Sequence, residues 1–155
     1  MLPPKTRQTV ALQDVPDQPR RYVFVLMPEF TMLCFSAAVE CLRIANRMAN
    51  RTLYTWTITG DADPGADLAH VACSAGVAFK LDGPLPELGR DDVVMVCGGI
   101  NVARATSKRL LNWLRREARR GLKVGGLCTA GHALAQAGLL DGKRATIHWE
   151  NHDSF

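Results

Sequence analysis

The sequence predicts an α/β fold, a three-layer α/β/α sandwich around a mostly parallel, flavodoxin-like sheet. Continuous apolar runs, among them YVFVLM at 22–27 and DVVMVC at 92–97, are typical of strands buried on both faces. Segments with helical periodicity separate these runs, which predicts right-handed parallel βαβ units. A length of 155 residues, 47% of them hydrophobic, suits one domain with a sizeable core.

The first half of the chain begins with a proline-rich segment. Residues 1–20 are expected to form a disordered leader ahead of a domain spanning 21–155. The strand at 22–27 stops at Pro28, and a helix is predicted over 33–48. A strand at 53–59 and one or two short strands within 71–80 follow. The residues expected to face inward from the helix are Leu33, Ala37, Val39, Leu42, Ile44 and Ala45.

The second half repeats the strand and helix alternation. The strand at 92–97 ends in two glycines, and Thr106 is expected to cap a basic helix that ends near Gly121. A strand at 122–127, a helix over 129–137 and a glycine stop come next. Arg144 to His148 is expected to begin a further strand, after which the sheet is incomplete at the C-terminus.

The most informative motif is GGLCTAG at 125–131, which reads as a strand, a sharp turn carrying Cys128, and a helix. Backbone amides and the helix dipole at such a turn favour a thiolate or a bound anion. Ligands of parallel sheets bind beyond the carboxyl ends of the strands. Glu29, Gly98-Gly99, Cys128 and His148 follow four of these ends and are therefore expected to converge.

The composition argues against membrane, secreted, disulfide-rich and metal-binding classes of protein. No apolar run approaches the roughly 20 residues of a membrane span, and the N-terminus lacks a signal-peptide core, so a cytoplasmic protein without membrane partners is expected. The five cysteines are odd in number and lack C-x-x-C spacing, which argues against a zinc site, a disulfide framework or any other metal site. Nothing indicates a cofactor.

Basic residues gather on the predicted helix after Thr106, with Glu117 as the opposing charge. They suit a nucleic-acid-facing surface or an ordinary solvated face. The solvated face is favoured because no base-reading motif accompanies them. The basic residues are Lys108, Arg109, Arg115, Arg116, Arg119, Arg120 and Lys123.

Four motifs in order then resemble a known family: LCFSAAVECLRIANRM, VCGG, GLCTAGHALAQAGLLDG and ATIHWEN. From residue 21 to the end, the chain resembles the N-terminal domain of AraC-type transcriptional regulators of the GlxA class. That domain belongs to the PfpI-like, class I glutamine amidotransferase-like superfamily. The segment FTMLCFSAAVECLRIANRMANRTLYTW is most similar to regulators that respond to glycine betaine, carnitine or arginine.

The resemblance implies roles for particular residues. In the superfamily's enzymes the turn cysteine, here Cys128, is the nucleophile, and a histidine matching His148 lies near it. Backbone amides matching Gly98, Gly99 and Thr129 line an anion pocket. An acidic residue beside the thiol falls on Cys34 here, which supplies neither charge nor a ready proton. Enzymatic activity is therefore disfavoured, since neither Glu29 nor Glu40 is an obvious replacement.

The leading hypothesis is a ligand-sensing domain that binds a small amine or amino-acid-like effector. Its expected ligand-binding residues are Gly98, Gly99, Cys128, Thr129, His148, Trp149 and Glu150. Trp149 with Glu150 suits a cationic ligand, although ordinary packing explains the tryptophan equally well. Two alternatives stay open: Cys128 is a packed residue at a tight turn, and His148 is a hydrogen-bonded residue at a strand end. His132 is interpreted as a surface or packing residue.

The alternative is a cysteine-dependent amidase, peptidase or hydratase that uses Cys128 and His148. A third hypothesis is that the basic helix binds nucleic acid directly. Intact regulators of this class are expected to be homodimers and to contact DNA through a C-terminal helix-turn-helix module, which this chain lacks. The incomplete sheet predicts poor solubility or oligomerisation of the chain alone.

Overall fold

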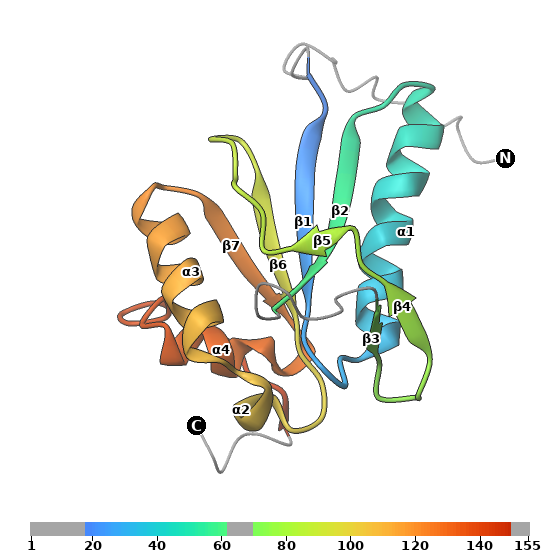
Figure 1. Ribbon diagram of the computed structural model, residues 1–155. Helices are drawn as coiled ribbons and strands as arrows, with labels where there is room; N and C mark the ends of the chain where they lie inside the picture. The colour runs from blue at the N-terminus through green and yellow to red at the C-terminus, as the bar shows by residue number, and fades with distance from the viewer. Residues whose placement is uncertain (1–17, 62–69, 150–155) are drawn as a thin grey trace, which may run out of the picture.

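The computed structural model of the chain describes residues 18–61 and 70–149. Its main sheet is parallel, with the spatial order β5-β2-β1-β6-β7 (Figure 1). The order β2-β1-β6-β7 is that of flavodoxin-like sheets, so the predicted fold class is confirmed. The strands are β1 (Arg20–Leu26), β2 (Tyr54–Gly60), β5 (Gly83–Pro84), β6 (Val93–Cys97) and β7 (Lys123–Leu127).

Helices cover both faces of this sheet. In Figure 1, α1 lies on one side of the sheet, and α3 and α4 lie on the other. A small antiparallel pair, β3 (His70–Ala72) with β4 (Ala78–Lys80), packs on the α1 side and accounts for the two short strands predicted around Gly76. The helices are α1 (Met32–Ala49), α2 (Val102–Ala105), α3 (Lys108–Arg119) and α4 (Gly131–Gln136), with a 3-10 turn η1 (Cys128–Ala130) before α4.

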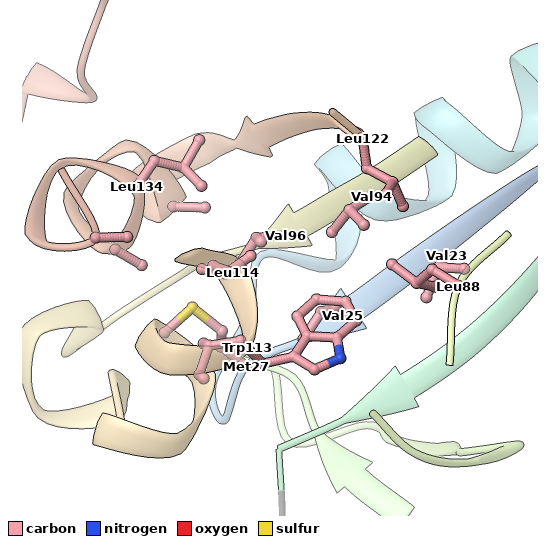
Figure 2. Close-up of a cluster of buried hydrophobic side chains, with 14 of the residues drawn as sticks. Val23, Val25, Met27, Leu88, Val94, Val96, Trp113, Leu114, Leu122 and Leu134 are labelled. Carbon is pink, nitrogen blue, oxygen red and sulfur yellow. The ribbon is translucent and has the colours of Figure 1, made fainter. Parts of the chain in front are cut away.

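Alternating residues of the central strands build two cores. Val23 and Val25 of β1, with Met27 just after it, belong to the core beneath α3 and α4, and Figure 2 shows Val25 and Met27 near Trp113. The intervening residues of the same strand join Phe30, Phe35 and Cys97 in the core beneath α1. A strand with both faces buried needs a continuous apolar run, which explains why these strands could be recognised in the sequence.

The predicted inward face of α1 is partly wrong. Of the residues expected to face inward, Val39 and Leu42 pack against the core. Leu33, Ala37 and Ile44 are exposed instead. Phe35 and Ala38, which the prediction left out, contact the core beside Leu42, and residues 35, 38 and 42 follow the i, i+3, i+7 spacing of a helix face. Periodicity therefore identified the helix correctly but placed its buried face only in part.

The cap of the basic helix also differs from its prediction. Ser107, and not Thr106, precedes α3, and its hydroxyl oxygen accepts a hydrogen bond from the Leu110 amide at 3.0 Å. Thr106 instead follows the end of α2, and its hydroxyl donates a hydrogen bond to the carbonyl of Val102, the first residue of that helix, at 2.7 Å. The short α2 was not predicted. Because of it, Thr106 ends one helix and Ser107 begins the next.

The strand predicted from Arg144 to His148 is absent, because this segment has no ladder partner among the described residues. It lines an open cleft together with residues of β7 and forms no ladder with that strand. The predicted leader lies outside the described residues except for 18–20, and Glu150 lies outside them entirely. Within 18–61 and 70–149, no helix is both long and apolar enough to cross a membrane.

Leu114→Ala should lower the free energy of unfolding by about 2–5 kcal/mol, because Leu114 is fully buried between α3 and the sheet. Leu33→Ala is the matched control on α1, where the side chain is 76% exposed, and it should change stability by less than about 0.5 kcal/mol. Urea denaturation measures both. Equal losses for the two variants would contradict the core assignment.

Candidate functional site

The loops after β1, β6 and β7 meet at the carboxyl edge of the sheet. Backbone and hydroxyl hydrogen bonds tie each loop to its neighbours, so the three strand ends form one rigid cluster. The bonds run from Met27 N to Cys97 O (3.1 Å), Thr31 N to Gly98 O (3.0 Å), Gly98 N to Leu127 O (3.2 Å) and Thr129 Oγ1 to Gly99 O (2.8 Å).

Gly98 and Gly99 sit where the loops approach most closely. A Cβ on Gly99 would lie 1.9 Å from the Glu29 carbonyl oxygen, and one on Gly98 would lie 2.5 Å from the Ala130 nitrogen. A Cβ at either distance would force the neighbouring backbone to move, which explains why glycine is found at both positions. In the described structure, the backbone that approaches this pair is therefore the protein's own.

Cys128 lies at a sharp turn between β7 and α4, which we call the elbow (residues 127–131). Its φ of 56° is in the left-handed region, which L-residues other than asparagine and aspartate rarely occupy. The Thr31 hydroxyl lies 3.3 Å from the Cys128 sulfur. Thr31 occupies the N-cap position of α1 without making a side-chain cap bond, because its hydroxyl is directed to the sulfur.

Cys34, in the first turn of α1, interacts with Cys128. Burial raises the pKa of the Cys34 thiol, and the charge of Cys128 and a hydrogen bond to it raise that pKa further. The position that the resemblance assigns to an acid is thus beside the elbow sulfur, but it holds a second thiol. A protonated thiol cannot supply the negative charge that a carboxylate would place there.

The nearby glutamates are engaged elsewhere. The Glu29 carboxylate accepts a hydrogen bond from the Asn101 side chain at 2.9 Å. Glu40 is bonded to Arg43 on the exposed face of α1, with a shortest separation of 2.6 Å. Neither carboxylate therefore replaces the missing acid in this structure.

An open cleft of about 600 Å³ lies between β7 and the segment 144–148, and we call it the elbow cleft. Cys128 and His148 both contribute to its wall, and Arg144 places a cationic side chain there. Gly98, Gly99, Thr129 and Trp149 do not line it. The remaining lining residues are Val124, Gly125, Gly126, Leu127, Gly131, Leu134, Leu140, Ala145, Thr146 and Ile147.

The other predicted site residues have varied surroundings. Thr129 is buried, and Trp149 is 76% exposed with its ring centroid 5.6 Å from that of His148. His132 is buried on α4, and its Nδ1 has no hydrogen-bond partner among the described residues. Sequence reasoning missed Thr31 and Arg144. A threonine before a helix signals a cap, but nothing local signals that its hydroxyl turns to a sulfur.

A further thiol lies close to the pair but is inaccessible. Cys97, at the end of β6, is 1% exposed, and burial together with the charge of Cys34 raises its pKa to about 12. Within the described ranges, no three histidine, cysteine, aspartate or glutamate side chains gather as a metal site would require. Cys34 and Cys128 are therefore the part-exposed thiols near the elbow, and Cys128 also lines the elbow cleft.

A flavodoxin-like sheet with a cysteine at the turn that follows its edge strand defines a class of α/β domains. The sequence profile of the DJ-1/PfpI family matches residues 31–155, and the chain belongs to this family. The structure is similar to that of an AraC family transcriptional regulator from Pseudomonas putida, with a TM-score of 0.70 and 27% identity over 88% of this chain and 70% of that one. Schizosaccharomyces pombe DJ-1 shares the fold, with a TM-score of 0.64 at 16% identity over 87% of this chain and 70% of that one.

Curated relatives include transcriptional regulators and an enzyme. The HTH-type transcriptional regulator CdhR of Pseudomonas aeruginosa is 43% identical over 85% of this chain and 38% of its own length. For the regulator GbdR of the same organism the identity is 36%, over 85% and 35%. Isonitrile hydratase of Pseudomonas putida is 36% identical over 56% of this chain and 39% of its own length. The chain thus spans less than half the length of these relatives.

Gly99→Ala should lower the free energy of unfolding by about 1–3 kcal/mol or more, because its Cβ would overlap the Glu29 carbonyl. Gly89→Ala is the control, since its Cβ would meet only the Asp92 side chain, at 3.7 Å or beyond. Denaturation midpoints at constant slope measure the difference. A Gly99 variant as stable as the Gly89 variant would show that the loops can separate at no cost.

Cys128→Ala should lower the pKa of Cys34, because it removes both the charge and the hydrogen bond that raise it, leaving burial as the remaining cause. At any pH below the wild-type pKa, the thiolate fraction and the alkylation rate of Cys34 should then rise. Iodoacetamide labelling against pH, read by peptide mass spectrometry, measures this. Cys41→Ala, on the exposed side of α1, should leave the profile unchanged. A profile that moves to higher pH in Cys128→Ala would contradict the contact.

Proposed function

We propose that the chain is the effector-sensing domain of an AraC-type transcriptional regulator, and that a small amine or amino-acid-like metabolite binds in the elbow cleft. The observation that carries this proposal is the cleft itself, which lies beside the elbow cysteine of a chain homologous to such regulators. Its volume of about 600 Å³ is within the range of small-molecule sites. Binding would act on transcription by differential affinity for two states of the intact protein.

The lining of the cleft suits a zwitterionic ligand. Arg144 supplies a cation that would bind a carboxylate, and its planar guanidinium matches carboxylate geometry. Trp149 stands next to the cleft residue His148, with its ring exposed, and an indole face stabilises an ammonium group by roughly 0.5–2 kcal/mol. Apolar residues of β7 and α4 would contact the carbon skeleton. Amino acids and their N-methylated relatives carry these two charges at opposite ends.

Cys128 acts in this proposal as part of the wall and not as a nucleophile. Its neighbours are the Thr31 hydroxyl and the Cys34 thiol, which lack the charge that activates a cysteine. Gly98, Gly99 and Thr129 do not line the cleft; they lie where the loops after β1, β6 and β7 meet. Backbone contacts of the ligand with these residues would require a ligand long enough to reach past Cys128.

A cysteine-dependent hydratase, amidase or peptidase is the second candidate. The left-handed backbone of Cys128 and the position of His148 in the same cleft favour it, as does the similarity to an isonitrile hydratase. Turnover of an isonitrile or a simple amide that disappears in Cys128→Ala would establish this function in place of sensing.

The basic helix α3 gives little support to direct nucleic-acid binding. Arg116 and Arg120 pair with the buried Glu117, and Arg109 pairs with Asp61. Arg115 donates to the Gln136 and Ala137 carbonyls at the end of α4. Because these arginines bind groups within the domain, we propose that DNA is recognised by a helix-turn-helix module outside this chain.

We further propose that the domain spans 21–155, that the intact regulator is a homodimer and that it is located in the cytoplasm.

Glycine betaine, carnitine and arginine should be tested for thermal stabilisation of the chain. A ligand at about 100 times its dissociation constant stabilises the folded state by about 2.7 kcal/mol. Arg144→Gln should abolish the shift because it removes the carboxylate contact, whereas Cys128→Ala should retain it. Arg47→Gln is the matched control, an exposed arginine in the last turn of α1.

Two outcomes would overturn the sensing proposal. One is a shift that persists unchanged in Arg144→Gln, which would place the ligand elsewhere. The other is the absence of stabilisation by any small amine or amino acid while Cys128-dependent turnover is present.

A further inference from the structure

We propose that Cys34 and Cys128 form a two-thiol modification site, which low-molecular-weight disulfides oxidise to an intramolecular disulfide. The chemistry would join the first turn of α1 covalently to the elbow. It uses this chain's own side chains and does not depend on the identity or the existence of an effector.

The geometry begins with the N-cap of α1. The Thr31 hydroxyl contacts the Cys128 sulfur at 3.3 Å, which fixes the start of the helix against the elbow. Cys34 is three residues further, on the same side of the helix as Thr31. This places Cys34 on the side of the helix that meets the elbow, where its thiol interacts with that of Cys128, and both side chains are partly exposed. The two thiols are therefore neighbours at the start of α1 and within reach of a small reagent.

The other thiols are excluded by burial or by position. Cys73 and Cys97 are 3% and 1% exposed, so a dissolved disulfide cannot reach them in the folded chain. Cys41 is exposed, but it lies seven residues beyond Cys34, or roughly 10 Å along the helix axis. Among the described cysteines, Cys34 and Cys128 are the pair that combines proximity with access.

The reaction balances in two exchanges with a disulfide RSSR. The Cys128 thiolate attacks one sulfur, the S–S bond breaks, and RS⁻ leaves and takes up a proton, which forms a Cys128–SR mixed disulfide. The Cys34 thiolate then attacks the Cys128 sulfur and expels the second RS⁻. The two cysteines lose two electrons and two protons, and RSSR is reduced to two RSH.

The order of attack follows from the environment of each thiol. The charge of Cys128 and the hydrogen bond to it raise the pKa of Cys34, which disfavours Cys34 as the first nucleophile. Once Cys128 is a neutral mixed disulfide, that charge is gone, and the thiolate fraction of Cys34 rises. The first exchange therefore makes Cys34 a better nucleophile for the second.

The experiment treats the folded chain with oxidised glutathione and identifies the products by mass spectrometry. Trypsin with a glutamyl endopeptidase cuts after Glu40 and separates Cys34 from Cys41, so the linked cysteines are assigned without ambiguity. The expected product is a peptide pair joined through Cys34 and Cys128 that dithiothreitol separates. This wild-type result decides the proposal without any variant.

Variants test the roles of the two thiols. In Cys34→Ser, the linked pair should be lost completely, and the Cys128–glutathione mixed disulfide should accumulate. Cys41→Ser is the matched control and should give the wild-type pattern. The proposal is overturned if wild-type Cys128 stops at the mixed disulfide, if Cys128 stays free while Cys41 reacts, or if the link forms only after denaturation. None of these results depends on effector binding, so failure here leaves the sensing proposal untouched.

Discussion

The close approach of Gly98 and Gly99 to the neighbouring loops fixes the position of everything at the carboxyl edge of the sheet. The Glu29 carbonyl and the Ala130 amide occupy the space where side chains would otherwise begin. The same turn accepts hydrogen bonds from the Thr31 amide and the Thr129 hydroxyl. It therefore sets both the start of α1 and the start of the elbow, and the distance between them follows. That distance brings the Thr31 hydroxyl to the Cys128 sulfur.

The main sheet was largely predictable from the sequence, because strands buried on both faces need unbroken apolar runs. The run at 22–27 supplies residues to both cores, and a run of this kind has few other interpretations. The buried face of α1 was less clear from the sequence, because apolar residues occur on both sides of this helix. The sequence alone does not show that Phe35 packs on the core while Leu33 is exposed. The two-residue β5 and the four-residue α2 are too short to leave a periodic signal.

The sequence predicted only part of the lining of the elbow cleft. Cys128 and His148 both line it, whereas Gly98, Gly99, Thr129 and Trp149 do not. Cys34 interacts with Cys128, at the position where the resemblance expected an acid. The ends of β1 and β6 were also expected to border a ligand, because ligands of parallel sheets bind beyond the carboxyl ends of the strands. In the structure these ends pack on each other, and the open space lies one strand further, outside β7. Such a displacement depends on loop packing between residues about 70 apart, such as Phe30 and Gly99, which no local pattern encodes.

The wall that β7 gives to the elbow cleft contains Gly125 and Gly126, so much of that wall is main chain. Main-chain groups are the same whatever the side chains are, and both glycines are constrained by Met95 and Leu134 behind them. The polar side chains of the opposite side come from residues 144–148, which form no ladder with the sheet among the described residues. Substitutions in that short segment would change the polarity of the cleft while the sheet and its turns stayed as they are.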